Sequence, residues 1–465
     1  MTKMSIESRT AGQLPKIREK RPLKKRAHIK TFGCQMNVHD SARMAQLLER
    51  EGYVFTARME RADLILVNTC SVRKNPENKV YSLLGRLAIQ KRRNPNVVIG
   101  VAGCVAQREA ENILHRCKAV DLAFGTDAIF RLPEMLRRVS QGERIVSTDR
   151  IPGEKRVRNF IPDRELETGT VDGCRGLIAI SKGCDNFCSF CIVPTVRGGL
   201  VSREIGNIVL EAKDLIKKGA KEIRLLGQNV NSYKANGEDF YSLIDTLSDL
   251  KGLKRLRFTS PHPNDWDSSL TDLVAEKPVV CNQIHLPFQA GADRILDKMQ
   301  RGHTAAEYIA KIDYLKRKIP DVTISTDIIV GFPGETEEEF EETLQVMRHV
   351  RFLPVYAFQY SPRPGTKAAG WEDDVPPVTK RKRLQRVLNL QKEIQDEILN
   401  AMVGTKQEIL IDSAHPKERQ TMNGRTGGNV PVSIADPELD IGDILSVKIV
   451  GKKTHSLIGE SFKCQ

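Results

Sequence analysis

The chain has 465 residues, which is too long for one hydrophobic core, and at roughly 100–200 residues per domain we expect two to four domains. Hydrophobic residues make up 40% and charged residues 28%, a balance that excludes an intrinsically disordered chain. No run approaches the ~20 apolar residues of a membrane span, and no apolar signal-peptide core is present, so we expect a cytoplasmic protein without a membrane partner. The net charge of +14 favours a polyanion such as nucleic acid as partner.

The first 145 residues predict a tail followed by an α/β domain. Residues 1–27 are polar and basic without apolar periodicity, which is typical of a flexible tail. Over 28–145, short apolar runs alternate with helix-like stretches, as in ADLILVNTC followed by YSLLGRLAIQKRR. A repeated strand–turn–helix pattern predicts a parallel sheet. Residues 146–169 are charged and without clear periodicity, and we interpret them as a linker.

The remaining chain predicts a second α/β domain and a small β-barrel. Over 170–402 about six strand–helix units follow one another, which predicts a complete or partial (βα) barrel. From 403 to 465, KQEILID and DILSVKIVGKK alternate apolar and polar residues, with glycines and polar turns between them. This pattern predicts a small antiparallel barrel.

Ten cysteines in this chain are too few for a disulfide scaffold, so we expect thiols that are free or metal-bound. Three cysteines are clustered and three are dispersed at regular intervals. The others follow no pattern and are expected to be small buried or incidental thiols; they are Cys117, Cys174, Cys281 and Cys464.

The segment GCDNFCSFCIVPTVRG places Cys184, Cys188 and Cys191 at the spacing C-x3-C-x2-C, directly after an apolar strand. Three thiolates within so short a loop can hold three irons of a [4Fe–4S] cube, whose fourth iron then has no protein ligand. A structural zinc ion takes four ligands, and no nearby Cys or His completes such a set. The spacing therefore predicts a cluster whose open iron binds a small molecule.

Cys34, Cys70 and Cys104 each lie where an apolar run ends and a helical pattern begins. In a parallel sheet, such loops emerge at the carboxyl edge, so three thiols distant in sequence converge on one rim. Core cysteines would fall inside the strands, and a disulfide would use only two of the three. A second three-thiolate iron–sulfur cluster explains all three positions, and buried thiols remain the alternative.

The clustered loop, with Phe190 before its last cysteine, resembles that of the radical S-adenosylmethionine enzymes. The phrases TFGCQMN, VNTCSVR and AGCVAQR around the dispersed cysteines resemble the N-terminal domain of the methylthiotransferases. These enzymes join that domain to a radical S-adenosylmethionine barrel and a small TRAM β-barrel, and the resemblance covers about 28–465. Gln35-Met36-Asn37 and HLPFQAGADRILDKMQRGHT resemble the branch that modifies tRNA carrying N6-dimethylallyladenosine.

The resemblance implies a methylthiotransferase N-terminal domain over 28–145, a partial (βα)6 radical S-adenosylmethionine core over 170–402 and an RNA-binding TRAM domain over 403–465. It implies a transferase that uses S-adenosylmethionine as methyl donor and radical source. The implied reaction is radical methylthiolation at C2 of the isopentenylated adenine at position 37 of the tRNA, beside the anticodon. No catalytic side chain beyond the cluster ligands is expected, because cofactors carry the difficult chemistry. Two [4Fe–4S] clusters are implied, with Cys34, Cys70, Cys104, Cys184, Cys188 and Cys191 as ligands.

Five further residues are candidates for binding S-adenosylmethionine, each with a structural alternative. By the resemblance, Phe190 packs near the adenine; core packing is its alternative. Gln228 and Asn229 follow an apolar strand and would face the barrel mouth, unless they only form a turn. Gly331 and Gly334 would permit close approach of the adenosine moiety to the backbone. The alternative is that these glycines only form the turn into an acidic helix.

The expected partners are tRNA with isopentenylated adenosine, S-adenosylmethionine, an electron donor and a sulfur source, and we expect a monomer. Two alternatives to the tRNA reaction stay open. One is the same chemistry on a ribosomal-protein side chain or on threonylcarbamoyl-adenosine tRNA, and the other is a non-catalytic iron–sulfur protein that binds RNA. Arg197 and Arg294 are expected to form ordinary surface ion pairs, and the alternative is that they hold a carboxylate or a phosphate. The candidate RNA contacts are the basic tail, Lys91-Arg92-Arg93, the basic face over 380–386, and Arg425, Lys448, Lys452 and Lys453 of the last domain.

Overall fold

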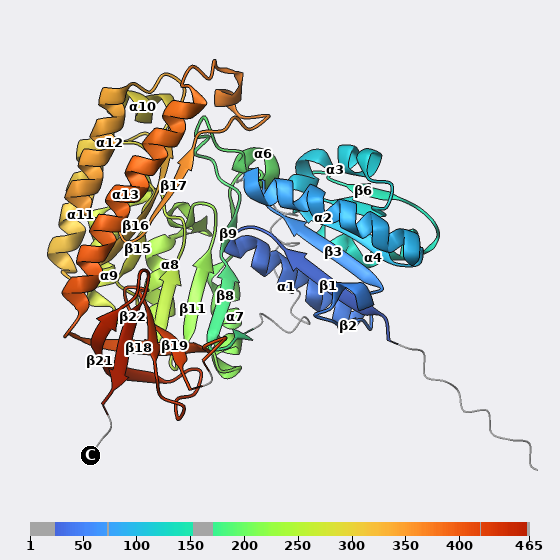
Figure 1. Ribbon diagram of the computed structural model, residues 1–465. Helices are drawn as coiled ribbons and strands as arrows, with labels where there is room; N and C mark the ends of the chain where they lie inside the picture. Colours follow the sequence, from blue (N-terminus) through green and yellow to red (C-terminus); the bar gives the residue numbers. More distant parts are fainter. Residues whose placement is uncertain (1–23, 72–73, 152–170, 419, 463–465) are drawn as a thin grey trace, which may run out of the picture.

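A computed structural model describes residues 24–71, 74–151, 171–418 and 420–462. The predicted tail and linker therefore lie largely outside the described residues, as does Cys464. Three units follow one another along the chain: a parallel sheet with helices, a larger strand–helix unit, and a small closed barrel (Figure 1). None of the helices in the described ranges is long and apolar enough to cross a membrane.

The N-terminal unit is a six-stranded sheet with the order β2-β1-β3-β4-β5-β6, and every neighbouring pair is parallel. This confirms the predicted parallel sheet, and the last strand extends two residues past the predicted domain end. The strands are β1 (Arg26–Thr31), β2 (Val54–Phe55), β3 (Leu64–Thr69), β4 (Val98–Gly103), β5 (Leu122–Phe124) and β6 (Ile145–Ser147). The helices are α1 (Gln35–Arg50), α2 (Lys74–Arg93), α3 (Cys104–Arg116) and α4 (Leu132–Ser140), with short 3-10 turns η1 (Met59–Arg61) and η2 (Ile129–Arg131).

Strand β3 shows why this sheet needs helices on both faces. Its six residues are all buried, and successive side chains point to opposite faces. Leu64 and Leu66 pack into an apolar cluster with helices α1 and α4, whereas Ile65 and Val67 pack with α2 and α3. A continuous apolar run is therefore the sequence signature of a strand covered on both sides.

The central unit is a partial barrel of six parallel strands. Strand β8 pairs with β11, β11 with β14, β15 with β16 and β16 with β17, and an isolated parallel bridge between Leu256 and Val280 links the two halves. The strands are β8 (Arg175–Ala179), β11 (Glu222–Leu226), β14 (Arg255–Phe258), β15 (Gln283–His285), β16 (Thr323–Val330) and β17 (Val355–Gln359).

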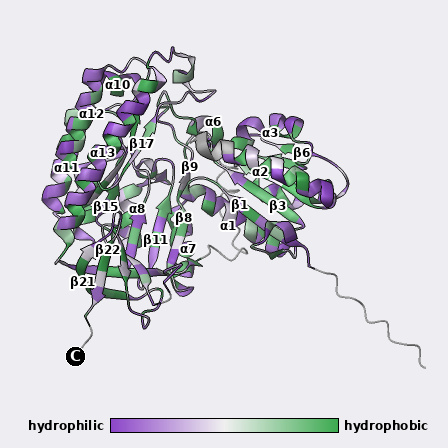
Figure 2. Ribbon diagram, in the orientation of Figure 1, coloured by the Kyte–Doolittle hydropathy of each residue, from purple (hydrophilic) through white to green (hydrophobic). Residues whose placement is uncertain are grey.

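Helices surround this barrel and share one large apolar core with its strands. In Figure 2, helices α10 to α13 carry much of the hydrophilic colour on the outside of the unit. The helices are α6 (Val193–Arg197), α7 (Ile205–Lys217), α8 (Phe240–Ser248), α9 (Ser268–Glu276), α10 (Asp293–Lys298), α11 (Ala305–Lys318), α12 (Glu337–Val350) and α13 (Pro377–Met402). Smaller elements are β7 (Val171–Asp172), β9 (Ser181–Lys182), β10 (Val201–Ser202), β12 (Lys234–Ala235), β13 (Glu238–Asp239), η3 (Val230–Ser232), η4 (Pro263–Asp265) and η5 (Lys367–Gly370).

The C-terminal unit is a closed barrel with the order β18-β19-β20-β22-β21. Its strands are not all antiparallel as predicted, because β20 and β22 pair in parallel. A closed ring with an odd number of strands cannot alternate direction throughout, so one pair must be parallel. The strands are β18 (Lys406–Ala414), β19 (Met422–Thr426), β20 (Pro431–Ile434), β21 (Ile444–Lys452) and β22 (Leu457–Ser461).

The small barrel lies against the amino ends of the central strands, opposite to their carboxyl ends (Figure 1). Arg255, the first residue of β14, donates from Nη1 to the carbonyl oxygen of Arg425 at 2.7 Å. Arg257 donates to the carbonyl oxygens of Gly427 and Thr426 at 2.8 and 3.0 Å. The carboxyl ends of the central strands therefore stay free for a site.

We predict that Arg257→Met destabilises the protein by about 3 kcal/mol, because it removes a buried partner of Glu222 as well as two contacts to the small barrel. Arg257 Nε lies 2.8 Å from Glu222 Oε2, and both side chains are almost fully buried. Arg224 still pairs with the other carboxylate oxygen, at 3.1 Å, which limits the loss. The thermal unfolding midpoint tests this. Arg348→Met, in an exposed pair with Glu341, is the control, and an equal midpoint in both variants would contradict the prediction.

Candidate metal centres

The dispersed cysteines, which we call the first trio, follow three adjacent strands of the N-terminal sheet. Cys34 precedes α1 just after β1, Cys70 directly follows β3, and Cys104 begins α3 directly after β4. The thiols of Cys34 and Cys70 are hydrogen-bonded. The three cysteines therefore lie together at the carboxyl edge of the sheet, as predicted.

Two glycines allow the loops of the first trio to approach one another. Gly33 has a φ of +131°, and a Cβ there would lie 2.4 Å from Cys70 Cβ. Gly103 has a φ of +91°, and a Cβ there would lie 2.4 Å from the carbonyl oxygen of Thr69. Only glycine fits such close backbone contacts, so the Gly-Cys pairs of the sequence have a steric reason.

Asn37 holds the Cys34 loop against β3. Its Oδ1 accepts from Cys34 Sγ at 3.3 Å, and its Nδ2 donates to the carbonyl oxygen of Thr69 at 2.9 Å. The amide of Asn68 donates back to the carbonyl oxygen of Asn37 at 2.8 Å. Both asparagines are fully buried, so these hydrogen bonds fix the loop in one conformation.

The charges around the first trio favour one thiolate in particular. The hydrogen bond from the Cys70 thiol, followed by the positive charge of Arg197, lowers the pKa of Cys34 to about 6. Burial raises the pKa of Cys104, and the charge of Arg197 acts against that rise. Arg197 therefore favours the thiolate form, which is the form that binds metal.

The clustered cysteines, which we call the second trio, lie in the loop between β9 and α6, at the carboxyl end of the central barrel. Gly183 has a φ of +85°, and a Cβ there would lie 2.1 Å from the carbonyl oxygen of Gly199. The amide of Cys191 donates to the carbonyl oxygen of Cys188 at 2.9 Å. Burial raises the pKa of Cys184, and it raises the pKa of Cys191 to about 12.

Buried apolar contacts join the two cysteine-bearing regions. Cys104 packs with Ile192 and Val196, and Ile192 directly follows Cys191 of the second trio. On α1, Met36 packs against Ala179 and Leu226 of the central barrel. The two trios therefore lie on either side of one interface with buried apolar residues.

Buried ion pairs reinforce this interface. Arg197 Nη2 donates to Asp40 Oδ2 at 2.8 Å, and less than a tenth of either side chain is exposed. Lys182 Nζ donates to Asp127 Oδ1 at 2.5 Å and to the carbonyl oxygen of Thr126 at 2.8 Å. Each pair joins the N-terminal unit to the loop that carries the second trio.

The donor sets fit clusters better than single ions. Within the described ranges, no three His, Cys, Asp or Glu side chains are arranged to hold one metal ion. A tetrahedral zinc ion with bonds of about 2.3 Å needs its sulfur ligands close together, whereas each cysteine of a [4Fe–4S] site bonds a different iron. Each trio offers three thiols with an arginine nearby, which suits a cluster. Cys70 and Cys104 are buried, Cys34 is exposed, and the three thiols of the second trio are half-buried.

The residues predicted to contact S-adenosylmethionine lie near the second trio, and their hydrogen-bond and packing partners differ from one residue to the next. Gln228 Oε1 accepts from the amide of Gly183 at 2.5 Å, so Gln228 supports the cysteine loop. Asn229 donates to Asp265 at 2.7 Å, and its buried Oδ1 has no hydrogen-bond partner among the described residues. Phe190 packs edge-on against Phe332 at a centroid distance of 6.5 Å.

The two predicted glycines are closely approached by lysines. A Cβ on Gly331 would lie 2.4 Å from Lys380 Cγ, and one on Gly334 would lie 2.6 Å from Lys298 Nζ. Both glycines have positive φ and precede the acidic helix α12, as the turn alternative requires. Binding of S-adenosylmethionine by these residues stays a prediction.

Three buried polar oxygens at the carboxyl ends of the central strands have no hydrogen-bond partner in the part of the chain that the structure describes. Besides Asn229 Oδ1, they are Ser181 Oγ, after β8, and Gln289 Oε1, after β15. Unpaired buried acceptors are costly, so they are suited to a polar ligand at the barrel mouth.

Sequence analysis missed the charged residues of the interface. Asp40, Asp127 and Lys182 carry no motif of their own, and their pairing requires knowledge of how the two units meet. Arg197 was expected to form a surface ion pair, which is wrong, because 3% of the residue is exposed. Arg294 does form the expected surface pair, with Glu339 at 2.6 Å.

The predicted basic RNA face over 380–386 is largely occupied. Arg383 pairs with Glu335 at 2.8 Å, and Arg386 pairs with Glu337 at 2.7 Å. Lys380 is buried and pairs with Asp373. Carboxylates from neighbouring segments thus pair with three of the basic residues of this face, and binding of RNA there stays a prediction.

Comparison with known proteins assigns the chain to a family. Residues 26–125 match the model of "Uncharacterized protein family UPF0004", and residues 178–347 match that of the Radical SAM superfamily. A curated tRNA-2-methylthio-N(6)-dimethylallyladenosine synthase from Geotalea uraniireducens is 44% identical over 93% of this chain and 98% of its own length. The chain belongs to the tRNA-2-methylthio-N(6)-dimethylallyladenosine synthase family.

Other comparisons agree with this assignment. The synthase of the same name from Geobacter metallireducens is 45% identical over 93% of this chain and 97% of its own. A solved radical S-adenosylmethionine methyltransferase, TsrM from Kitasatospora setae, shares the fold with a TM-score of 0.57, at 14% identity, over 75% of this chain and 74% of its own. The family relation confirms the predicted resemblance. The first trio lies within the UPF0004 match and the second within the Radical SAM match.

We predict that Lys182→Met lowers stability by about 3 kcal/mol, because it removes the buried ammonium that lies 2.5 Å from the buried carboxylate of Asp127, and the pair of Asp127 with Arg150 is longer, at 3.5 Å. Lys218→Met is the matched control in the same domain. Its pair with Asp214 is about one-third exposed and is worth only about 0.5 kcal/mol. The thermal unfolding midpoint compares the two, and a drop no larger than that of Lys218→Met would refute the structural role of Lys182.

Proposed function

We propose that this protein is a tRNA methylthiotransferase that converts N6-dimethylallyladenosine beside the anticodon into its 2-methylthio derivative. The observation that carries this proposal is the pair of cysteine trios on either side of one buried interface. Membership of the synthase family supports the substrate and the reaction. The proposal names a transferase that depends on S-adenosylmethionine and on iron–sulfur clusters.

In this proposal, each trio holds one [4Fe–4S] cluster, and the second trio also takes S-adenosylmethionine on its open iron. When bound, these groups supply the electron transfer, radical and sulfur chemistry that no side chain provides. The first trio comprises Cys34, Cys70 and Cys104, and the second comprises Cys184, Cys188 and Cys191.

The chain itself orients these groups and excludes water from them. Met36 and Ile192 seal the interface with apolar side chains, so a reactive species formed there meets little solvent. The unpaired oxygens of Ser181, Asn229 and Gln289 supply acceptors for the amino and hydroxyl groups of S-adenosylmethionine. Gln228 acts indirectly, by holding the Gly183 amide that precedes Cys184.

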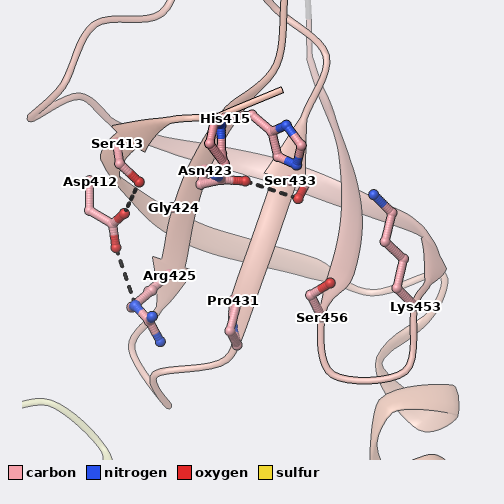
Figure 3. Close-up of a pocket in the computed structure, with 11 residues that line it drawn as sticks. Asp412, Ser413, His415, Asn423, Gly424, Arg425, Pro431, Ser433, Lys453 and Ser456 are labelled. Atoms are coloured by element: carbon pink, nitrogen blue, oxygen red, sulfur yellow. Dashed lines mark hydrogen bonds and ion pairs between the residues drawn. The ribbon is translucent and has the colours of Figure 1, made fainter. Parts of the chain in front are cut away.

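We propose that the small barrel contacts the tRNA through a pocket of about 350 Å³ (Figure 3). His415, Arg425 and Lys453 line it, together with serine hydroxyls. His415 Nδ1 accepts from the amide of Glu418 at 3.0 Å, which leaves Nε2 as a donor. Donors of this kind suit phosphate and ribose rather than base edges. In this arrangement, an RNA bound here must run the length of the central barrel to reach the trios.

Several finer points belong to the same proposal. The enzyme takes electrons and sulfur from separate donors, and it acts as a monomer in the cytoplasm. The N-terminal domain ends near Ser147, the radical domain extends from about 170 to Met402, and a TRAM domain follows. The closed barrel and its basic pocket support the last assignment.

Reconstitution tests the proposed function. The iron-loaded protein, incubated with isopentenylated tRNA, S-adenosylmethionine, sulfide and a reductant, should give the methylthio nucleoside by mass spectrometry. The wild type should bind about eight irons, and replacement of the first trio by Ala should leave about four and no product. Cys117→Ala, outside both trios, is the control and should behave as wild type. A triple variant with the full iron load, or product formed on a ribosomal protein instead, would refute the proposal.

The barrel pocket is tested with two neighbouring lysines. Lys453→Ala should weaken tRNA binding and reduce the salt dependence of the binding constant by about one ion, because its ammonium faces the pocket. Lys452→Ala is the matched control, since Lys452 pairs with Asp396. Binding titrations over a range of salt concentrations measure both effects. If Lys452→Ala weakened binding as much as Lys453→Ala, the pocket would not be the contact.

A further inference from the structure

Each cysteine trio has one buried arginine beside it. Arg301 donates from Nη1 to Cys188 Sγ at 3.3 Å, and only 4% of the residue is exposed. Arg197, with 3% exposed, lies beside the first trio, where its positive charge acts on Cys34 and Cys104. Both side chains hold a permanent positive charge in a setting of low polarity.

The two arginines differ in what neutralises them. Arg197 pairs with Asp40 at 2.8 Å, and Asp40 also acts electrostatically on Cys34 and Cys104. Arg301 has no carboxylate partner within the described ranges, and its other nitrogen contact is the carbonyl oxygen of Pro287 at 2.7 Å. The charge of Arg197 is therefore cancelled by a carboxylate in direct contact with it, whereas the charge of Arg301 beside Cys188 is not.

Neighbouring side chains respond to the unpaired charge of Arg301. Burial, and then the charge of Arg301, lowers the pKa of His303 to about 4, and the same two causes lower that of His262 to about 2. Asp185 and Asp265 also act on the second trio, through Cys184. Neither carboxylate pairs with Arg301; Asp265 accepts from Asn229, and Asp185 from the amide of Leu200.

We propose that Arg301 raises the reduction potential of the cluster on the second trio, and that Asp40 keeps the potential of the other cluster low by cancelling the charge of Arg197. Reduction adds one electron, taken from an external one-electron donor, and no covalent bond forms or breaks. A buried positive charge stabilises the added negative charge, and hydrogen bonds to cluster sulfurs act in the same direction. These residues are positioning residues that direct the electron towards the second trio.

The inference rests on the proposed function, because it needs both clusters. The test uses full-length chains that keep one trio, while the three cysteines of the other trio are replaced by Ala. The reduction potential of each chain is measured by redox titration, followed by electron paramagnetic resonance. Iron analysis of each chain checks the proposed function separately. If the single-trio chains without any further substitution bound no iron, that result would contradict the proposed clusters themselves.

In the chain that keeps the first trio, Asp40→Asn should shift the potential upward and Arg197→Met downward. Opposite shifts follow from removing opposite charges, and a merely structural role would not produce them. If Arg197→Met fails to load iron, Arg197→Lys replaces it and should leave the potential closer to that of the parent. Shifts of the same sign, or no shift with iron retained, would overturn the inference.

In the chain that keeps the second trio, Arg301→Met should shift the potential downward, and Arg301→Lys should shift it less because the charge remains. Arg294→Met is the matched control, since Arg294 lies on the surface and pairs with Glu339. An unchanged potential in Arg301→Met with iron retained, or an equal shift in Arg294→Met, would overturn the inference.

Discussion

The buried contact between the N-terminal sheet and the cysteine loop of the central barrel is the constraint on which the site depends. Arg197 and Asp40 meet there at 2.8 Å, and both belong to segments that directly adjoin the cysteine trios. If this contact opened, the loops of each trio would stay intact, but the two trios would no longer lie at one interface. The proposed transfer of a group between two centres requires both at once.

Such a contact is costly in desolvation, and a buried ion pair is weak evidence for stability. Its value lies in specificity, because a misplaced interface would leave Arg197, Asp40, Lys182 or Asp127 buried without a partner. The apolar contacts of Met36 and Ile192 supply the favourable burial. Charge then selects one arrangement among the many that apolar surface alone permits.

Much of the fold and site could be predicted from sequence because the signals are local. Strand runs such as LILVNT, and the spacing of Cys184, Cys188 and Cys191, are set within a few residues. The parallel β20–β22 pair and the pairing of Arg197 are determined by contacts between distant segments. The acidic partners of the basic face over 380–386 were not predicted for the same reason, since they lie on a distant segment, at and just before the start of α12.

The central claim is that the two trios hold clusters at one shared interface, and electron paramagnetic resonance of the reduced protein tests it most directly. Two paramagnetic clusters on either side of one interface should couple magnetically. The account predicts that the spectrum of the intact protein is broadened and relaxes faster than the spectra of the two single-trio proteins. A spectrum equal to the sum of those two would contradict it.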